Sequence, residues 1–114
     1  MNVGDVYSVE IPSGDGHEQS GARPAIIVQA IRFEKQLPTI LIVPLASQLA
    51  AQSFPGTFLI KPDVESGLTM PSIALVFQLR AIDKRRLKRK IGKLSSTHLI
   101  EMQKHIKDLL QLAI

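Results

Sequence analysis

Apolar residues in this chain come in short runs that glycine and proline interrupt, and these interruptions limit the choice of fold. The strongest run, at 40–46, contains Pro44 and is far shorter than the roughly 20 apolar residues of a membrane-spanning helix. Residues 5–11 alternate between two faces, with Val6 on one and Val9 and Ile11 on the other. This alternation is typical of a half-buried antiparallel strand.

Further strands are predicted at 25–33, 39–44, 57–60 and 72–82. Pro24 is placed at the start of the first of these, because proline has no N–H to donate to a ladder. A single helical turn is expected within 46–52, and two prolines and a glycine make 61–71 a loop. Residues 84–94 are ambiguous, because their apolar positions have helical spacing whereas Gly92 argues against a long helix.

The carboxyl-terminal segment carries the clearest helical pattern. Hydroxyl side chains at 95–97 can cap its first turn. The apolar stripe that follows has helical spacing and consists of Leu99, Met102, Ile106, Leu109, Leu110 and Ala113. Short antiparallel strands and one terminal helix predict a mainly β fold, most simply a small barrel of antiparallel strands with a C-terminal helix on one side. A length of 114 residues suits a single domain, 1–114.

Composition narrows the functional classes. The chain has no cysteine, which excludes disulfides and thiolate zinc sites, and its three histidines are too scattered for a metal cage. The amino-terminal residues lack a basic head followed by an apolar core, so secretion is not expected. These features predict a cytoplasmic protein that needs neither a metal nor a cofactor and has no membrane partner.

Polar chemistry gathers between two predicted strands, at 16–24. The segment offers an imidazole, a carboxylate, an amide, a hydroxyl and a guanidinium, from His17, Glu18, Gln19, Ser20 and Arg23. In RNA, the 2′-hydroxyl can attack the neighbouring phosphate if a base removes its proton and an acid protonates the leaving 5′-oxygen. His17 or Glu18 can transfer these protons, and Arg23 can stabilise the charge that gathers on the phosphate oxygens.

A simpler interpretation of the same residues remains open. Glu18 and Arg23 can pair across the loop, and an exposed pair contributes only about 0–1 kcal/mol to stability. A second basic feature, 84–93, holds half of all the lysine and arginine in the chain and can attract a polyanion over long range. A charge run of this kind can also be a solvated face that keeps the protein soluble.

Several motifs occur in an order that is similar to a known family. They are Gly4-Asp5-Val6-Tyr7, Gly16-His17-Glu18-Gln19-Ser20-Gly21 with Arg23-Pro24, Val43-Pro44-Leu45 with Ser47-Gln48, Phe54-Pro55-Gly56-Thr57, and Gln78-Leu79-Arg80 continuing through Lys90-Ile91-Gly92-Lys93. In these motifs the chain resembles the MazF/PemK toxins of type II toxin–antitoxin systems. The resemblance implies an SH3-like barrel, a homodimer, and sequence-specific cleavage of single-stranded RNA without metal to 2′,3′-cyclic phosphate and 5′-hydroxyl ends. It also implies a small acidic antitoxin as partner.

The resemblance also suggests roles for individual positions. Arg23 matches the family's catalytic arginine, and His17 matches a proposed acid or base of the PemK-like branch. Gln19, Ser20, Gln48, Gln78 and Arg80 fall where relatives line the RNA groove.

Two positions depart from the family pattern. Ala46 stands where relatives have a catalytic threonine, and the adjacent Ser47 can replace it only if the backbone has already left the strand. Phe77 stands where relatives often carry an acid. These departures place more of the expected chemistry on His17, Glu18 and Arg23.

Two other functions are compatible with the sequence. The same barrel serves CcdB-like toxins, which poison DNA gyrase through protein contact. The loss of threonine at Ala46 and of an acid at Phe77 would also suit a family member that binds RNA or antitoxin without turnover. Arg23-Pro24 and the basic run at 84–93 favour RNA over a protein target.

Overall fold

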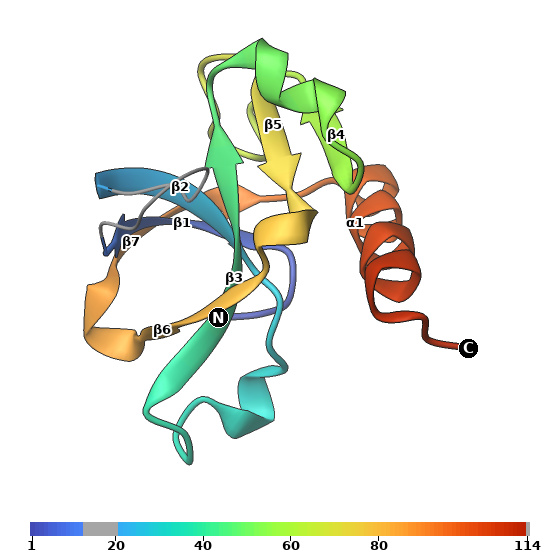
Figure 1. The fold of residues 1–114 in the computed structure, drawn as a ribbon. Helices are drawn as coiled ribbons and strands as arrows, with labels where there is room; N and C mark the ends of the chain where they lie inside the picture. Colours follow the sequence, from blue (N-terminus) through green and yellow to red (C-terminus); the bar gives the residue numbers. More distant parts are fainter. Residues whose placement is uncertain (13–20, 114) are drawn as a thin grey trace.

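The computed structural model describes residues 1–12 and 21–113. The chain forms β1 (Asp5–Ile11), β2 (Gly21–Ile27), β3 (Thr39–Ala46), β4 (Thr57–Ile60), β5 (Ser72–Leu75), β6 (Arg80–Asp83), β7 (Leu87–Lys93) and α1 (Ser96–Leu110). These strands pair antiparallel in the order β4-β5-β3-β2-β1-β7, with β6 also paired to β3 (Figure 1). The prediction of a mainly β fold with a terminal helix is confirmed.

Strand β3 organises the sheet because it pairs with a different partner at each end. Thr39–Ile42 pair with β6, whereas Leu45 and Ala46 pair with β5. The other edge of β3 pairs with β2 through Ile42, Val43 and Pro44. Because β3 exchanges partners along its length, the sheet curls. Within residues 1–12 and 21–113 the sheet does not close into a barrel, because β4 and β7 at its two ends do not pair.

The two faces of the sheet carry separate apolar cores. Val6 packs with Ile26, Val43 and Met102 in the core that faces α1, whereas Val9 and Ile11 pack in another core. The remaining members of this second core are Ala25, Ile27, Ile40, Ile42 and Ile82. The predicted alternation along β1 is therefore correct, since successive side chains of a strand point to opposite faces.

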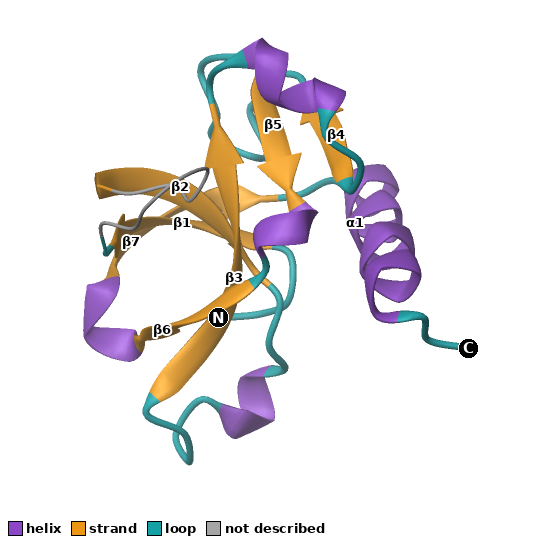
Figure 2. Ribbon diagram, viewed as in Figure 1, coloured by secondary structure: helices purple, strands orange, loops and turns teal. Residues whose placement is uncertain are grey.

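Helix α1 begins as the hydroxyl pattern predicts. The Ser95 hydroxyl accepts a hydrogen bond from the His98 backbone N–H at 3.2 Å, which caps the first turn. The helix lies beside β4 (Figure 2), and the Phe58 ring stacks on His105 with centroids 5.5 Å apart. Both helix histidines therefore serve packing, since His98 also stacks on Phe58. Among the described helices, none has the length and apolar character needed to cross a membrane.

Three of the predicted strands have the wrong bounds. Strand β2 begins at Gly21 and ends at Ile27, and a short 3-10 turn at Ile31–Phe33 replaces the rest of the strand predicted at 25–33. Pro24 consequently lies inside β2, opposite Ser8 of β1. It is tolerated there because pairing with β3 starts only at Ala25, so residues 21–24 have a ladder on one side alone in the described structure.

The other differences concern partner exchange along β3. The strand predicted at 72–82 is two strands, β5 and β6, separated by a 3-10 turn at Val76–Gln78, because each pairs with a different end of β3. Strand β3 continues to Ala46 rather than ending at residue 44. The ambiguous segment 84–94 contains a 3-10 turn at Lys84–Arg86 followed by β7. It therefore forms no α-helix, although its apolar residues have helical spacing.

Candidate functional site

A pocket of about 280 Å³ lies where β2 and β3 meet the 61–71 loop. Its lining includes Arg23 of β2, Ala46 of β3 with Ser47 directly after it, Thr69 and Met70 of the loop, and Ser72 of β5. Two of these, Arg23 and Ser47, are residues that the sequence singles out as catalytic candidates. The structure therefore brings together two candidates that are far apart in the chain.

Arg23 lies near the start of β2, before the strand enters the core. It pairs with Val9 of β1, and the next residue on its face, Ala25, is completely buried. Arg23 itself is exposed and lines the pocket. A guanidinium at such a place can present a planar fork of donors to a phosphate.

Ser47 follows directly on the last residue of β3. Ala46 is only 5% exposed and packs with Ile73 and Leu75, whereas Ser47 is exposed in a bend. The backbone has thus left the strand at residue 47, which is the condition under which Ser47 can take over from the missing threonine. Its hydroxyl-bearing side chain lines the same pocket as Arg23.

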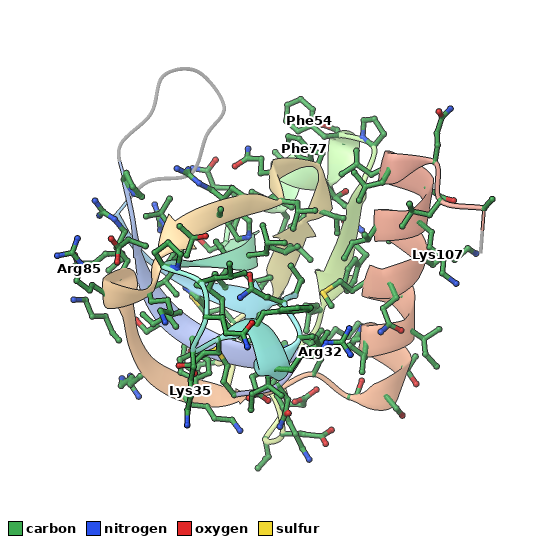
Figure 3. All side chains as sticks on the ribbon, turned by 90° about the horizontal axis from the view of Figure 1, so that it is seen from below. Arg32, Lys35, Phe54, Phe77, Arg85 and Lys107 are labelled. Atoms are coloured by element: carbon green, nitrogen blue, oxygen red, sulfur yellow. The ribbon has the colours of Figure 1, made fainter. Side chains whose placement is uncertain are left out.

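Among the described residues, three other predicted site residues, Gln48, Gln78 and Arg80, lie outside the pocket lining. Gln48 is exposed at the start of a 3-10 turn at Leu49–Ser53. Gln78 ends the 3-10 turn at Val76–Gln78, Arg80 pairs with Ile42 of β3, and both are half-buried. Phe77, at the position where relatives often carry an acid, packs its ring against Phe54 with centroids 5.4 Å apart (Figure 3). His17, Glu18, Gln19 and Ser20 fall outside the described residues.

The basic run at 84–93 occupies the 3-10 turn at Lys84–Arg86 and the edge strand β7. Lys88 lies 3.8 Å from Glu10, and Lys90 lies 3.5 Å from the buried carboxylate of Asp5. Arg89 and Lys93 are exposed and make no ion pair with the described residues. Lysines on an edge strand also discourage pairing with another sheet, so this strand has a structural use as well.

Asp83 is held ionised by Arg85. The Arg85 side chain donates to both carboxylate oxygens, at 3.1 and 2.9 Å, and its backbone N–H donates at 2.8 Å. These hydrogen bonds lower the pKa of Asp83 from 3.8 to about 2. Arg85 projects on the side of the molecule away from Lys107 of α1 (Figure 3), so its charge is not near the helix.

We expect Arg85→Ala to raise the pKa of Asp83 back toward 3.8. A lowered folded-state pKa stabilises the protein above the unfolded value, and this contribution is lost as the pH falls from about 4 through about 2. Titration of the Asp83 carboxyl by NMR measures the shift. A pKa that stays near 2 in the variant would contradict the assignment to Arg85.

The loop wall of the pocket was not predicted as part of the site. Leu68, Thr69 and Met70 line the pocket together with Ser72, but the sequence pattern indicates only a loop for this segment. Its prolines and glycine carry no signal of function. Among the described side chains, no group of three or more histidine, aspartate or glutamate residues gathers as a metal site.

The sheet order and the terminal helix define a protein of the MazF fold. The crystal structure of MazF from Deinococcus radiodurans superimposes with a TM-score of 0.82 at 19% identity, covering 98% of this chain and 97% of that one. A MazE–MazF complex from the same organism gives a TM-score of 0.74 at 21% identity, covering 99% and 97%. At these identities the likeness shows the fold.

Sequence comparison shows the family. A family model described as the PemK-like, MazF-like toxin of type II toxin–antitoxin systems matches residues 2–110. Endoribonuclease MazF of Staphylococcus epidermidis is 32% identical over 99 residues, which cover 87% of this chain and 82% of the relative. The chain belongs to the PemK-like, MazF-like toxin family.

Proposed function

We propose that this toxin is an endoribonuclease that cleaves single-stranded RNA at specific sequences, without a metal ion. The observation that carries the proposal is the shared pocket of Arg23 and Ser47, in a chain whose relative bears the name endoribonuclease MazF. An arginine and a hydroxyl at one opening supply a donor for phosphate charge and a group able to hydrogen-bond the reacting oxygens.

The proposed reaction is an internal phosphoryl transfer. The 2′-oxygen of a ribose loses its proton and bonds to the adjacent phosphorus, while the bond from phosphorus to the 5′-oxygen breaks and that oxygen takes a proton. The products are a 2′,3′-cyclic phosphate and a 5′-hydroxyl. We assign the proton transfers to His17 and Glu18 and the stabilisation of phosphate charge to Arg23.

The remaining predicted residues are assigned to substrate contact. We propose that Gln19, Ser20, Gln48, Gln78 and Arg80 bind RNA on either side of the scissile phosphate. Ser47 is assigned a hydrogen bond to the reacting phosphate, because it lines the same pocket as Arg23 and has left the strand that buries Ala46.

We expect Ser47→Ala to lower the cleavage rate about 10- to 100-fold, the loss of one hydrogen bond to a charged phosphate of about 1.5–3 kcal/mol. Ala46→Thr also tests whether Ser47 replaces the missing threonine, because it restores a hydroxyl where relatives have threonine. In the Ala46→Thr background the Ser47→Ala change should cost less than in the wild type, since the two hydroxyls would be redundant. Single-turnover cleavage measures both costs. Equal losses in the two backgrounds would mean that the hydroxyls act independently, and an unchanged rate in Ser47→Ala would remove Ser47 from the site.

The basic strand is proposed to attract RNA before it reaches the pocket. Arg89→Gln combined with Lys93→Gln should reduce the log–log salt slope of RNA binding by about 1.4, because each phosphate of a single strand that is no longer neutralised lowers the slope by about 0.7. Lys90→Gln is a poorer probe, because it removes the partner of the buried Asp5 carboxylate. Fluorescence anisotropy over a range of salt measures the slope, and an unchanged slope would mean that β7 is only a solvated edge.

The proposed partners follow the family. Because a MazE–MazF complex shares the fold, we propose a small acidic antitoxin as partner, a homodimer as the working form, and the cytoplasm as the location. Exposed apolar side chains support a dimer surface: Leu49, Phe54, Leu109, Leu110 and Leu112. We treat residues 1–114 as one toxin domain, with no cofactor and no membrane partner.

An RNA-binding protein without turnover is the second candidate. The burial of Ala46 and the packing of Phe77 on Phe54 favour it, because both positions lack the catalytic groups of relatives. Incubation of the purified protein with a long unstructured RNA in EDTA separates the two functions. Discrete fragments ending in 2′,3′-cyclic phosphate support the enzyme, whereas intact RNA with a retained mobility shift supports the binder.

A further inference from the structure

The loop 61–71 forms a wall of the pocket that the proposed chemistry leaves unused. Thr69 and Met70 are both exposed, and Met70 keeps 57% of its surface accessible although it is apolar. Both line the pocket together with Arg23. A ligand that contacts the guanidinium therefore meets a thioether and a hydroxyl from the same loop.

The loop is held in one conformation by its own hydrogen bonds. The Asp63 carboxylate accepts from the Ser66 N–H at 2.6 Å, and the buried Ser66 hydroxyl accepts from the Leu68 N–H at 3.2 Å. On the far side, the Ser72 hydroxyl donates to the Met70 carbonyl at 3.1 Å. Thr69 and Met70 are thus presented between two fixed points.

The same loop is fixed relative to Arg23 through the sheet. The Lys93 N–H of β7 donates to the Glu65 carbonyl at 2.9 Å, which ties the loop to that strand. Strand β7 pairs with β1, where Val9 lies opposite Leu87 on one side and opposite Arg23 on the other. Hydrogen bonds and strand pairing therefore connect the pocket wall to the strand that carries the guanidinium, and base recognition requires such a fixed arrangement.

We propose that Thr69 and Met70 select the base next to the scissile phosphate, an inference that rests on the proposed ribonuclease function. A nucleobase has an apolar face and a polar edge. The polarisable thioether of Met70 packs on the face, and the Thr69 hydroxyl hydrogen-bonds to the edge. At about 280 Å³ the pocket is at the small end of ligand sites, which suits one base.

Binding to uncleavable RNA tests the inference apart from catalysis. Short 2′-O-methyl oligonucleotides of uridine, cytidine and adenosine lack the attacking hydroxyl, and fluorescence anisotropy gives their relative affinities. We expect Met70→Ala and Thr69→Val each to reduce the ratio between the tightest and weakest oligonucleotide by about tenfold, the effect of one pocket interaction. Val64→Ala is the matched control, because Val64 lies in the same loop, is 99% exposed and is not in the pocket lining.

The outcomes separate this inference from the proposed function. A wild-type protein that binds all three oligonucleotides equally, or variants that keep the wild-type ratio with an unchanged Tm, would overturn the role of Thr69 and Met70 whether or not RNA is cleaved. If the wild type prefers one oligonucleotide and the variants lose that preference, the role of Thr69 and Met70 is supported, even if the wild type cleaves no RNA. If the wild type does cut, Met70→Ala should broaden the sequences found at the fragment ends, and an identical set of ends would count against the inference.

Discussion

Replacing Arg23 with alanine is expected to lower the rate of RNA cleavage by about 10²- to 10³-fold, the usual effect of removing one fixed donor for transition-state charge. The negative charge on the phosphate oxygens grows as the 2′-oxygen bonds to phosphorus, so the loss falls mainly on the rate. Arg23 lines the pocket together with Ser47, and the proposed reaction needs such a donor there. Single-turnover cleavage gives the rate, and anisotropy with a 2′-O-methyl analogue gives the affinity, which should change much less.

Two further variants make the Arg23 experiment specific. Arg23→Lys keeps the charge but loses the planar fork, so it should recover only part of the rate. Arg32→Ala is the control, because its guanidinium lies 4.8 Å from the centre of the Phe33 ring and is not in the pocket lining. A rate and an affinity that fall equally in Arg23→Ala would assign Arg23 to binding, and an unchanged rate would remove it from the site.

Local patterns predicted most of the elements because their causes are local. The alternation along β1 and the Ser95 cap of α1 depend only on neighbouring residues, and both are confirmed. The break between β5 and β6 depends on which end of β3 each segment meets. Nothing within 72–82 carries that information, so a continuous strand was the natural prediction.

The candidate site was predictable in part for the same reason. Arg23 and Ser47 stand out by residue type and by resemblance, and the structure places both at one pocket. Whether Ser47 lies in the strand depends on where β3 ends. The pattern predicted an end at residue 44, whereas the strand ends at Ala46. The wall at Thr69 and Met70 depends on how the loop folds across β7, an interaction between segments that no local signal reveals.

Gly92→Ala is expected to destabilise the fold by about 3 kcal/mol, the upper part of the range for overpacking a tight contact. A methyl group at residue 92 would overlap the Glu65 carbonyl oxygen and the carbonyl group of Ser66. These are backbone atoms of a loop that the Lys93 N–H and the Asp63 carboxylate hold in place, so they cannot move aside without breaking hydrogen bonds. Thermal and denaturant unfolding should both show the loss of stability.

Gly67 provides an internal comparison for Gly92, because it lies in the loop where that loop crosses β7 and faces Ile91 of the strand. A methyl group there would overlap the Ile91 carbonyl oxygen, and Gly67 also has a φ of +72°, which favours glycine. Gly67→Ala should therefore destabilise by about 1 kcal/mol more than Gly92→Ala, the added strain of a left-handed backbone. Arg89→Ala, exposed on the same strand as Gly92, should shift stability by less than about 0.5 kcal/mol. If Gly92→Ala unfolds no more easily than Arg89→Ala, the loop does not cross β7 as closely as the structure places it, and the fixed arrangement of Met70 and Arg23 fails with it.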